Sequence, residues 1–148
     1  MTDTFYITTP IYYVNSHPHI GHAYTTIVTD VLTRFRKLFG DDTYFLTGTD
    51  EHGQKIVESA SKAGVEPQAF VDMISREFRE MWPHLHIEFD QFIRTTDPEH
   101  KACVQQILQK IYDQGEIYLI EYEGLYCVGC ERFLDEAELE DGNCPDHQ

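Results

Sequence analysis

Apolar residues follow two different spacings along this chain, and each spacing predicts one kind of element. The segment FYITTPIYY, residues 5–13, is rich in β-branched and aromatic residues, which predicts a buried strand. DDTYFLTG, residues 41–48, and EFDQFIRTT, residues 88–96, predict a second and a third strand.

Helical spacing separates these strands. After the first strand, apolar residues recur every three or four positions on one face of a long helix that Gly40 ends, and they are Ile20, Ala23, Tyr24, Ile27, Val28, Val31, Phe35 and Leu38. Further helices are predicted over 54–63, 67–81 and 97–114. The alternation predicts an α/β fold, the first half of a doubly wound, Rossmann-like parallel sheet.

The character of the chain changes after Gly115. EIYLIEYEGLYC, residues 116–127, predicts a hairpin that leads into a cluster of cysteines. We therefore expect a domain boundary near Gln114, with residues 1–114 in the nucleotide-binding sheet and residues 115–148 in a separate segment.

Composition narrows the function classes. The 148 residues are about one domain in length, with ordinary hydrophobic (41%) and charged (25%) fractions. The net charge of −15 argues against a broad nucleic-acid contact, and residues 113–148, with eleven acidic residues and only Arg132 as a base, predict a solvated acidic face. There is no basic-then-apolar leader and no apolar run of about 18 residues, so we expect a cytoplasmic protein without a membrane partner.

The stretch HPHIGH, residues 17–22, holds three of the eight histidines at the junction between the first strand and the first helix. Ligands of open parallel sheets bind beyond the carboxyl ends of the strands, and a helix amino terminus favours phosphate. His19 and His22 would add imidazole donors, while Gly21 would let the backbone lie against a flat ligand. The alternative is that these histidines only cap the helix.

Two other nucleotide motifs are absent. In GTDEHGQK, residues 48–55, the lysine is not adjacent to the second glycine and no Ser or Thr follows it, so the segment is not a P-loop. No GxGxxG follows the first strand, which disfavours a dinucleotide cofactor.

The cysteine cluster has the spacing of a metal site. Cys127 and Cys130 are separated by two residues, and so are Cys144 and His147. Two such turns supply the four ligands of a tetrahedral structural zinc, and Gly129 and Pro145 suit tight turns. Free thiols or a disulfide are the alternative. Cys103 lies in a helical pattern and is expected to pack in the interior.

Three segments carry a resemblance to a known family: FYITTPIYYVNSHPHIGHAYTTIVTDVLTRF, FLTGTDEHGQKI and FDQFIRTTDPEH. From Phe5 to its end, the chain resembles the class I aminoacyl-tRNA synthetases, and among them the bacterial methionyl enzymes. The resemblance implies that methionine is activated with ATP, accompanied by Mg²⁺, to methionyl-adenylate and pyrophosphate. The methionyl group then passes to tRNA(Met).

The resemblance also implies roles for single residues. His19 and His22 would meet the ATP phosphates as catalytic residues, and Gly21 would admit the adenine. The methionine-binding residues would be Asp50 for the ammonium group, Tyr13 in the pocket and the backbone of Ile11. By spacing alone, Asp50 could equally cap the next helix and Tyr13 could simply pack. His17, Glu51 and His52 are expected to support the site from beside it.

The resemblance further implies that Cys127, Cys130, Cys144 and His147 form the zinc knuckle of a connective insertion between two sheet halves. A KMSKS-type lysine loop and a helical anticodon-binding domain are not in this sequence. We therefore expect an amino-terminal portion of a longer enzyme, inactive alone, with tRNA contacts mainly elsewhere. Two alternatives stay open: a leucyl, isoleucyl, valyl or cysteinyl enzyme of the class, or a non-enzymatic, zinc-stabilised nucleotide-binding module.

Overall fold

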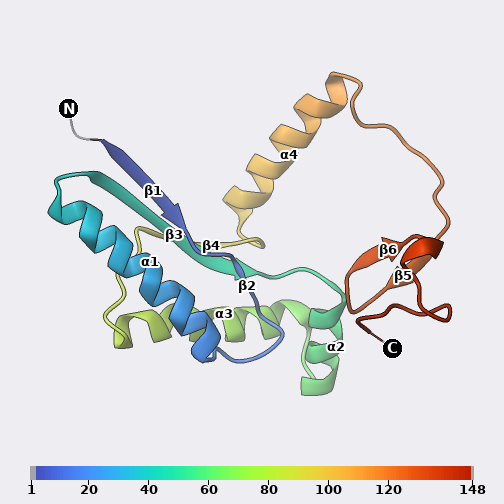
Figure 1. Ribbon diagram of the computed structural model, residues 1–148, viewed down its shortest axis with the longest axis horizontal. Coiled ribbons are helices and arrows are strands. Elements are labelled where there is room, and N and C mark those ends of the chain that lie inside the picture. The colour runs from blue at the N-terminus through green and yellow to red at the C-terminus, as the bar shows by residue number, and fades with distance from the viewer. Residues whose placement is uncertain (1–2, 148) are drawn as a thin grey trace.

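The computed structural model describes residues 3–147, and Figure 1 shows an α/β arrangement in which helices flank a small sheet. The elements in chain order are β1 (Thr4–Thr8), β2 (Tyr12–Tyr13), α1 (Ile20–Leu38), β3 (Asp42–Asp50), α2 (Gln54–Ala63), α3 (Pro67–His84), β4 (Gln91–Arg94), α4 (Pro98–Asp113), β5 (Leu125–Cys127), β6 (Arg132–Leu134) and the 3₁₀ helix η1 (Glu136–Glu138). The predicted fold class is confirmed.

The sheet is parallel throughout, with β3 at its centre. β1 and then β2 pair with one edge of β3, and β4 pairs with the other edge. Figure 1 shows α1 and α3 on the same face of the sheet, with α4 on the opposite side. This topology brings the carboxyl ends of β2, β3 and β4 to one edge, where a ligand site of such a sheet is expected.

The strand predicted over 5–13 is split in two, because its proline interrupts the ladder. Pro10 has no N–H to donate, and the backbone N–H of Thr9 makes the last bond to Leu46 at 3.1 Å. The Thr9 hydroxyl donates to the carbonyl of Pro10 at 2.8 Å. Pairing resumes only at Tyr12.

Helix boundaries follow the sequence signals closely. α2 has the predicted bounds, and Gly64 after it is left-handed with φ of 70°. α1 ends at Leu38, and Gly40 has φ of 87°. α3 runs three residues beyond the predicted end at Met81, so Pro83 lies within its last turn.

The apolar core lies between α3, α2 and the sheet. Phe45, Phe78 and Trp82 are fully buried in it. The remaining buried members come from the same elements and the loops beside them: Tyr12, Val14, Ile56, Ala60, Phe70, Val71, Ile74, Ile87 and Phe92. α3 supplies the largest share of this core.

The apolar pattern of α1 predicts that its apolar face is buried, but the structure buries a polar face instead. Its buried residues are Thr26, Thr29, Asp30 and Thr33, while most of the predicted apolar stripe faces outward, with Ile20 and Leu38 more than four-fifths exposed. The buried threonines satisfy their hydroxyls on carbonyls one turn earlier, so this polar face can be covered at little cost.

The hairpin predicted over 116–127 is wrong. Residues 115–124 form no strand, and Leu119 is fully exposed, because the segment has no partner to pair with among the described residues. The hairpin instead joins β5 to β6, with Cys127 opposite Arg132, so the first cysteine pair forms its turn. Within residues 3–147, no helix has the length and apolar character of a membrane span.

Candidate functional site

The two histidines at the start of α1 cap that helix. The His19 Nδ1 atom accepts the N–H of Gly21 at 3.1 Å, and the His22 Nδ1 atom accepts the N–H of His19 at 3.2 Å. The two rings stack with centroids 3.7 Å apart. The histidines therefore do cap the helix, as the alternative interpretation proposed. The Nε2 atom of each ring takes no part in these two hydrogen bonds.

Capping also determines which ring nitrogen carries the proton in each neutral histidine. Because each Nδ1 accepts a hydrogen bond, a neutral ring carries its proton on Nε2. The His22 ring lies 4.8 Å from the ring of Tyr12 and 5.0 Å from that of Phe78. Burial, and then the nearby His19, lower the pKa of His22. The helix amino terminus thus presents N–H donors from both imidazoles.

Gly21 lies close to the His19 ring of the cap. A Cβ atom at this position would lie 3.0 Å from Cε1 and 3.1 Å from Nδ1 of His19. A side chain would push the His19 ring away from the helix start. Whether Gly21 also admits an adenine stays a prediction.

Asp50 and Tyr13 are register partners at the ends of β3 and β2. Register partners in parallel strands project to the same face, and Asp50 contributes to the raised pKa of Tyr13, after the larger effect of Glu131. Ile11, two residues before Tyr13, is 41% exposed. The three predicted methionine-binding residues therefore lie close together at one edge.

The alternative role of Asp50 as a helix cap is wrong. Gly53 is the N-cap of α2, with φ of 125° and no side-chain cap. Within residues 3–147, the Asp50 carboxylate makes no hydrogen bond or ion pair. A carboxylate without a partner at a sheet edge is suited to bind a cation.

His17 and His52 join the loops around this edge. His17 Nδ1 lies 2.6 Å from Glu77 Oε2 on α3, and both side chains are exposed. His52 Nε2 lies 3.4 Å from the carbonyl oxygen of Thr95. Neither histidine is in direct hydrogen-bond contact with Asp50.

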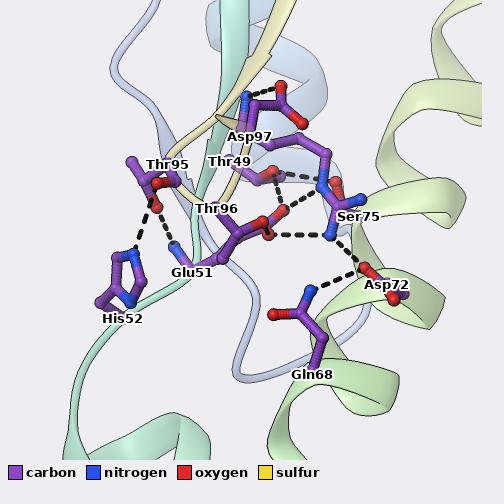
Figure 2. Close-up of polar contacts among 10 residues, drawn as sticks. Thr49, Glu51, His52, Gln68, Asp72, Ser75, Thr95, Thr96 and Asp97 are labelled. Carbon is purple, nitrogen blue, oxygen red and sulfur yellow. Dashed lines mark hydrogen bonds and ion pairs between the residues drawn. The ribbon is translucent and has the colours of Figure 1, made fainter. Parts of the chain in front are cut away.

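Glu51 is the buried centre of a polar network, which Figure 2 shows. Burial raises the pKa of Glu51, but hydrogen bonds from Arg94, Thr96 and Thr49 outweigh it, and the net shift is downward. The sequence placed Glu51 beside the site but missed Arg94. Its position was the available signal: Arg94 lies near the carboxyl end of the third predicted strand, residues 88–96, and this strand is the parallel neighbour of the second.

The predicted metal ligands come together in space. The Sγ atoms of Cys127, Cys130 and Cys144 and one ring nitrogen of His147 all lie within 4.8 Å of one another. His147 Nδ1 lies 3.2 Å from the sulfur of Cys130 and 3.9 Å from the sulfurs of Cys127 and Cys144. A tetrahedral zinc with bonds of about 2.0–2.3 Å needs ligand separations of this size.

The sulfur geometry argues against a disulfide. Cys130 and Cys144 Sγ are 3.6 Å apart, far beyond a bond of about 2.05 Å. The N–H of Cys130 donates to Cys127 Sγ at 3.4 Å and is the largest cause of the lowered pKa of Cys127. A Cβ on Gly129 would lie 2.3 Å from the His147 ring, so only glycine fits this turn.

The cysteine hairpin contacts the edge of the sheet. Lys55 Nζ donates to the carbonyl of Gly129 at 2.8 Å, and the Tyr13 hydroxyl donates to Glu131 at 3.2 Å. Cys103, in contrast, is exposed on α4, which corrects the expectation that it packs in the interior. None of the residues of α4 is buried, so its apolar spacing does not lead to burial here.

The family model for "tRNA synthetases class I (M)" matches residues 5–148. The chain belongs to this family. Its class I tRNA synthetase relatives include the methionine–tRNA ligase of Caldanaerobacter subterraneus subsp. tengcongensis, which is 53% identical over 99% of this chain. The chloroplastic/mitochondrial methionine–tRNA ligase of Arabidopsis thaliana is 51% identical, also over 99% of this chain. The chain spans only 23% and 24% of the lengths of these two relatives.

Solved structures agree with this family. Mycobacterium tuberculosis methionyl-tRNA synthetase in complex with methionyl-adenylate superposes with a TM-score of 0.88 and 45% identity, over 95% of this chain and 28% of that one. A LeuRS from Agrobacterium radiobacter K84, in a ternary complex, has a TM-score of 0.74 over 79% of this chain and 15% of its own. At 24% identity, the second likeness shows the fold alone.

Proposed function

We propose that this class I synthetase chain is the part of a methionine–tRNA ligase that binds ATP and methionine. The observation that carries the proposal is the similarity, at 45% identity, to an enzyme solved with methionyl-adenylate. On this proposal, residues 1–114 are the first half of the catalytic domain and residues 115–148 begin the connective insertion. The protein would act in the cytoplasm.

The first reaction is the attack of the methionine carboxylate on the α-phosphate of ATP, with pyrophosphate leaving. Negative charge grows on phosphate oxygens in this step, so positioned donors lower the barrier. His19 and His22 offer Nε2–H donors at the positive end of α1, which would bind these oxygens. Mg²⁺ would accompany ATP, and Gly21 would leave room for adenine at the helix start.

The methionine ammonium group would bind at the opposite side of the same edge. Asp50 supplies an unpaired carboxylate, and the backbone carbonyl of Ile11 would accept a second hydrogen bond. Tyr13 would line the methionine pocket. This places the amino acid and the phosphates at the carboxyl ends of neighbouring strands.

The knuckle would hold one structural Zn²⁺ through Cys127, Cys130, Cys144 and His147. Four protein ligands close the coordination sphere, so the metal would stabilise the hairpin and leave no position for substrate. Transfer of the methionyl group to tRNA(Met) would depend mainly on regions outside this chain. The charge of −15 fits that division, since an acidic surface repels a phosphate backbone.

Amino-acid-dependent ATP–pyrophosphate exchange tests the proposal. We would express the reading frame that encodes this chain to its natural stop codon and assay methionine, leucine, isoleucine, valine and cysteine separately. Exchange with methionine alone is expected. Exchange with another of these amino acids would keep the phosphate site and overturn the substrate, and no exchange at all would favour the nucleotide-binding module.

A matched pair of variants tests His22. Asparagine reaches the Nδ1 position and keeps the cap acceptor, whereas glutamine reaches the Nε2 position and keeps the donor. We expect His22→Asn to lower kcat about 10²–10³-fold, the usual cost of one donor to developing charge, and His22→Gln to lower it less. His84→Gln, at the exposed end of α3, is the control, and equal losses in both His22 variants would contradict the donor role.

A further inference from the structure

Glu51 is a buried carboxylate directly beside the proposed ammonium ligand. Its side chain belongs to a residue that is only 4% exposed, and it follows Asp50 immediately in sequence. Burial of a carboxylate is costly unless charge and hydrogen bonds compensate it. The structure supplies this compensation in full.

Both carboxylate oxygens of Glu51 accept two hydrogen bonds. Oε1 accepts from Arg94 Nε and from the Thr49 hydroxyl, each at 2.7 Å. Oε2 accepts from Arg94 Nη2 at 2.8 Å and from the Thr96 hydroxyl at 2.5 Å. A bidentate arginine fixes the plane of the carboxylate as well as its charge.

The network has a defined direction of donation. A carboxylate only accepts, so the single hydroxyl proton of Thr49 is committed to Glu51. The Ser75 hydroxyl, 2.9 Å from that of Thr49, must then donate to it. Helix α3, through Ser75, is thereby connected to the end of β3.

The same network fixes the turn that follows β4. The N–H of Glu51 donates to the Thr95 hydroxyl at 2.9 Å, and the N–H of Thr95 donates to the carbonyl of Thr49 at 3.2 Å. The Asp97 carboxylate accepts the N–H of Arg94 at 3.1 Å. Figure 2 shows these side chains converging from β3, β4 and α3.

Asp50 lies between the two fixed residues, and within residues 3–147 its side chain makes no hydrogen bond or ion pair. Thr49 and Glu51 both reach toward α3 and Arg94, so strand alternation directs Asp50 to the other face, which it shares with Tyr13. Arg94 neutralises Glu51, and its Nη2 also binds Asp72 at 2.5 Å. The local arrangement therefore leaves the negative charge of Asp50 available for a ligand.

We propose that Glu51, held by Arg94 and Thr96, is a positioning residue that fixes Asp50 for the ammonium group of the amino-acid substrate. This inference rests on the proposed function, since it requires an α-amino acid at Asp50. It adds a role for three residues that do not themselves touch substrate. Their effect is transmitted through the backbone on both sides of Asp50.

The decisive variant is Glu51→Gln in the full-length protein. The glutamine amide keeps the shape, but its NH₂ group must face donors from Arg94 or from the threonines. We expect KM for methionine to rise about tenfold, the effect of losing one charge-assisted bond, while KM for ATP changes by less than about twofold. Inhibition by L-methioninol, which keeps the ammonium group and lacks the carboxylate, should weaken by the same factor.

Two further variants keep the test valid if Glu51→Gln does not fold. Arg94→Lys keeps the charge and loses the bidentate geometry, and Thr96→Val removes one donor. We expect a larger rise of KM for methionine in Arg94→Lys than in Thr96→Val. Glu80→Gln, exposed on α3, is the matched control and should leave both KM values unchanged.

Active-site titration separates positioning from simple destabilisation. A purely structural role would lower the fraction of active enzyme and leave KM for methionine at its original value, which would overturn the inference. If the unaltered protein exchanges with another amino acid, the methionine assignment fails, and the same variants are assayed with that amino acid. If it binds no amino acid, the proposed function and this inference both fall.

Discussion

The sheet, with its flanking helices, and the cysteine hairpin are held together in different ways. The sheet buries a continuous apolar core in which Phe45, Phe78 and Trp82 are fully enclosed. In residues 125–147 the buried members are Cys127, Leu134 and Cys144, with Cys130 and Leu139 against them. The first region is stabilised by hydrophobic burial spread over many residues, whereas the second buries few, and on our proposal it depends on four metal ligands.

Metal removal should separate the stabilities of the two regions more than any other change. A structural zinc contributes an apparent binding free energy of about 10 kcal/mol or more in small knuckles, and this hairpin has little core to replace it. We expect a strong chelator to increase hydrogen exchange throughout residues 125–147 of the full-length protein while peptides from α3 stay protected. The measurement is hydrogen–deuterium exchange with and without added Zn²⁺.

The cysteines offer a control for that experiment. Cys144→Ser should lower the metal content below one ion per chain, whereas Cys103→Ser, on the exposed face of α4, should leave it unchanged. Equal zinc content in both variants would contradict the ligand assignment.

A substitution in the apolar core should destabilise the sheet region and leave the cysteine hairpin with its metal. Phe78 is fully buried and contacts the rings of Tyr12 and His22, so Phe78→Ala leaves a cavity worth about 3–5 kcal/mol. We expect a lower thermal midpoint and faster exchange in α3, with metal content unchanged. Loss of zinc in this variant would show that the two regions do not fold independently.

The Glu51 network should make stability depend on pH. The folded pKa of Glu51 is lowered from the ordinary value of 4.5, so its contribution is present above that value and is lost as the pH falls through the folded pKa. Glu51→Gln should cost about 1–3 kcal/mol near neutrality. The difference in thermal midpoint between the two proteins should shrink on acidification, and a constant difference would argue against an ionised Glu51.

The smallest effect is expected at the end of α2. Gly64 is left-handed, with φ of 70° and open space around it, so Gly64→Ala should cost only about 1 kcal/mol, as backbone strain. Lys62→Ala, two residues earlier, should be near neutral. Exchange rates of the last turn of α2 provide the comparison.

Local signals explain most of what the sequence predicted correctly. Gly64 and Pro67 bound their helices because each acts through its own backbone, and the cysteine spacing predicted the four side chains that the structure brings together. Pro10 also acts locally, and it divides the predicted first strand into β1 and β2.

The failures depend on long-range contacts. Spacing could not reveal that α1 buries threonines, since that depends on which face meets the sheet. The pairing of Glu51 with Arg94, 43 residues apart, follows only once β3 and β4 are known to be neighbours. The segment 116–124 had strand composition but no partner, and composition alone does not form a ladder.

The outward apolar face of α1 has a consequence for biosynthesis. This helix is made before the elements from β3 onward, and among residues 3–147 the side chains of Ile20, Tyr24 and Leu38 stay largely exposed. Translation proceeds at about 5–20 residues per second, so the nascent chain carries this face uncovered for seconds while later residues are still being made. Aggregation on the ribosome competes with folding during that interval, and slower expression with abundant chaperones should increase the soluble yield.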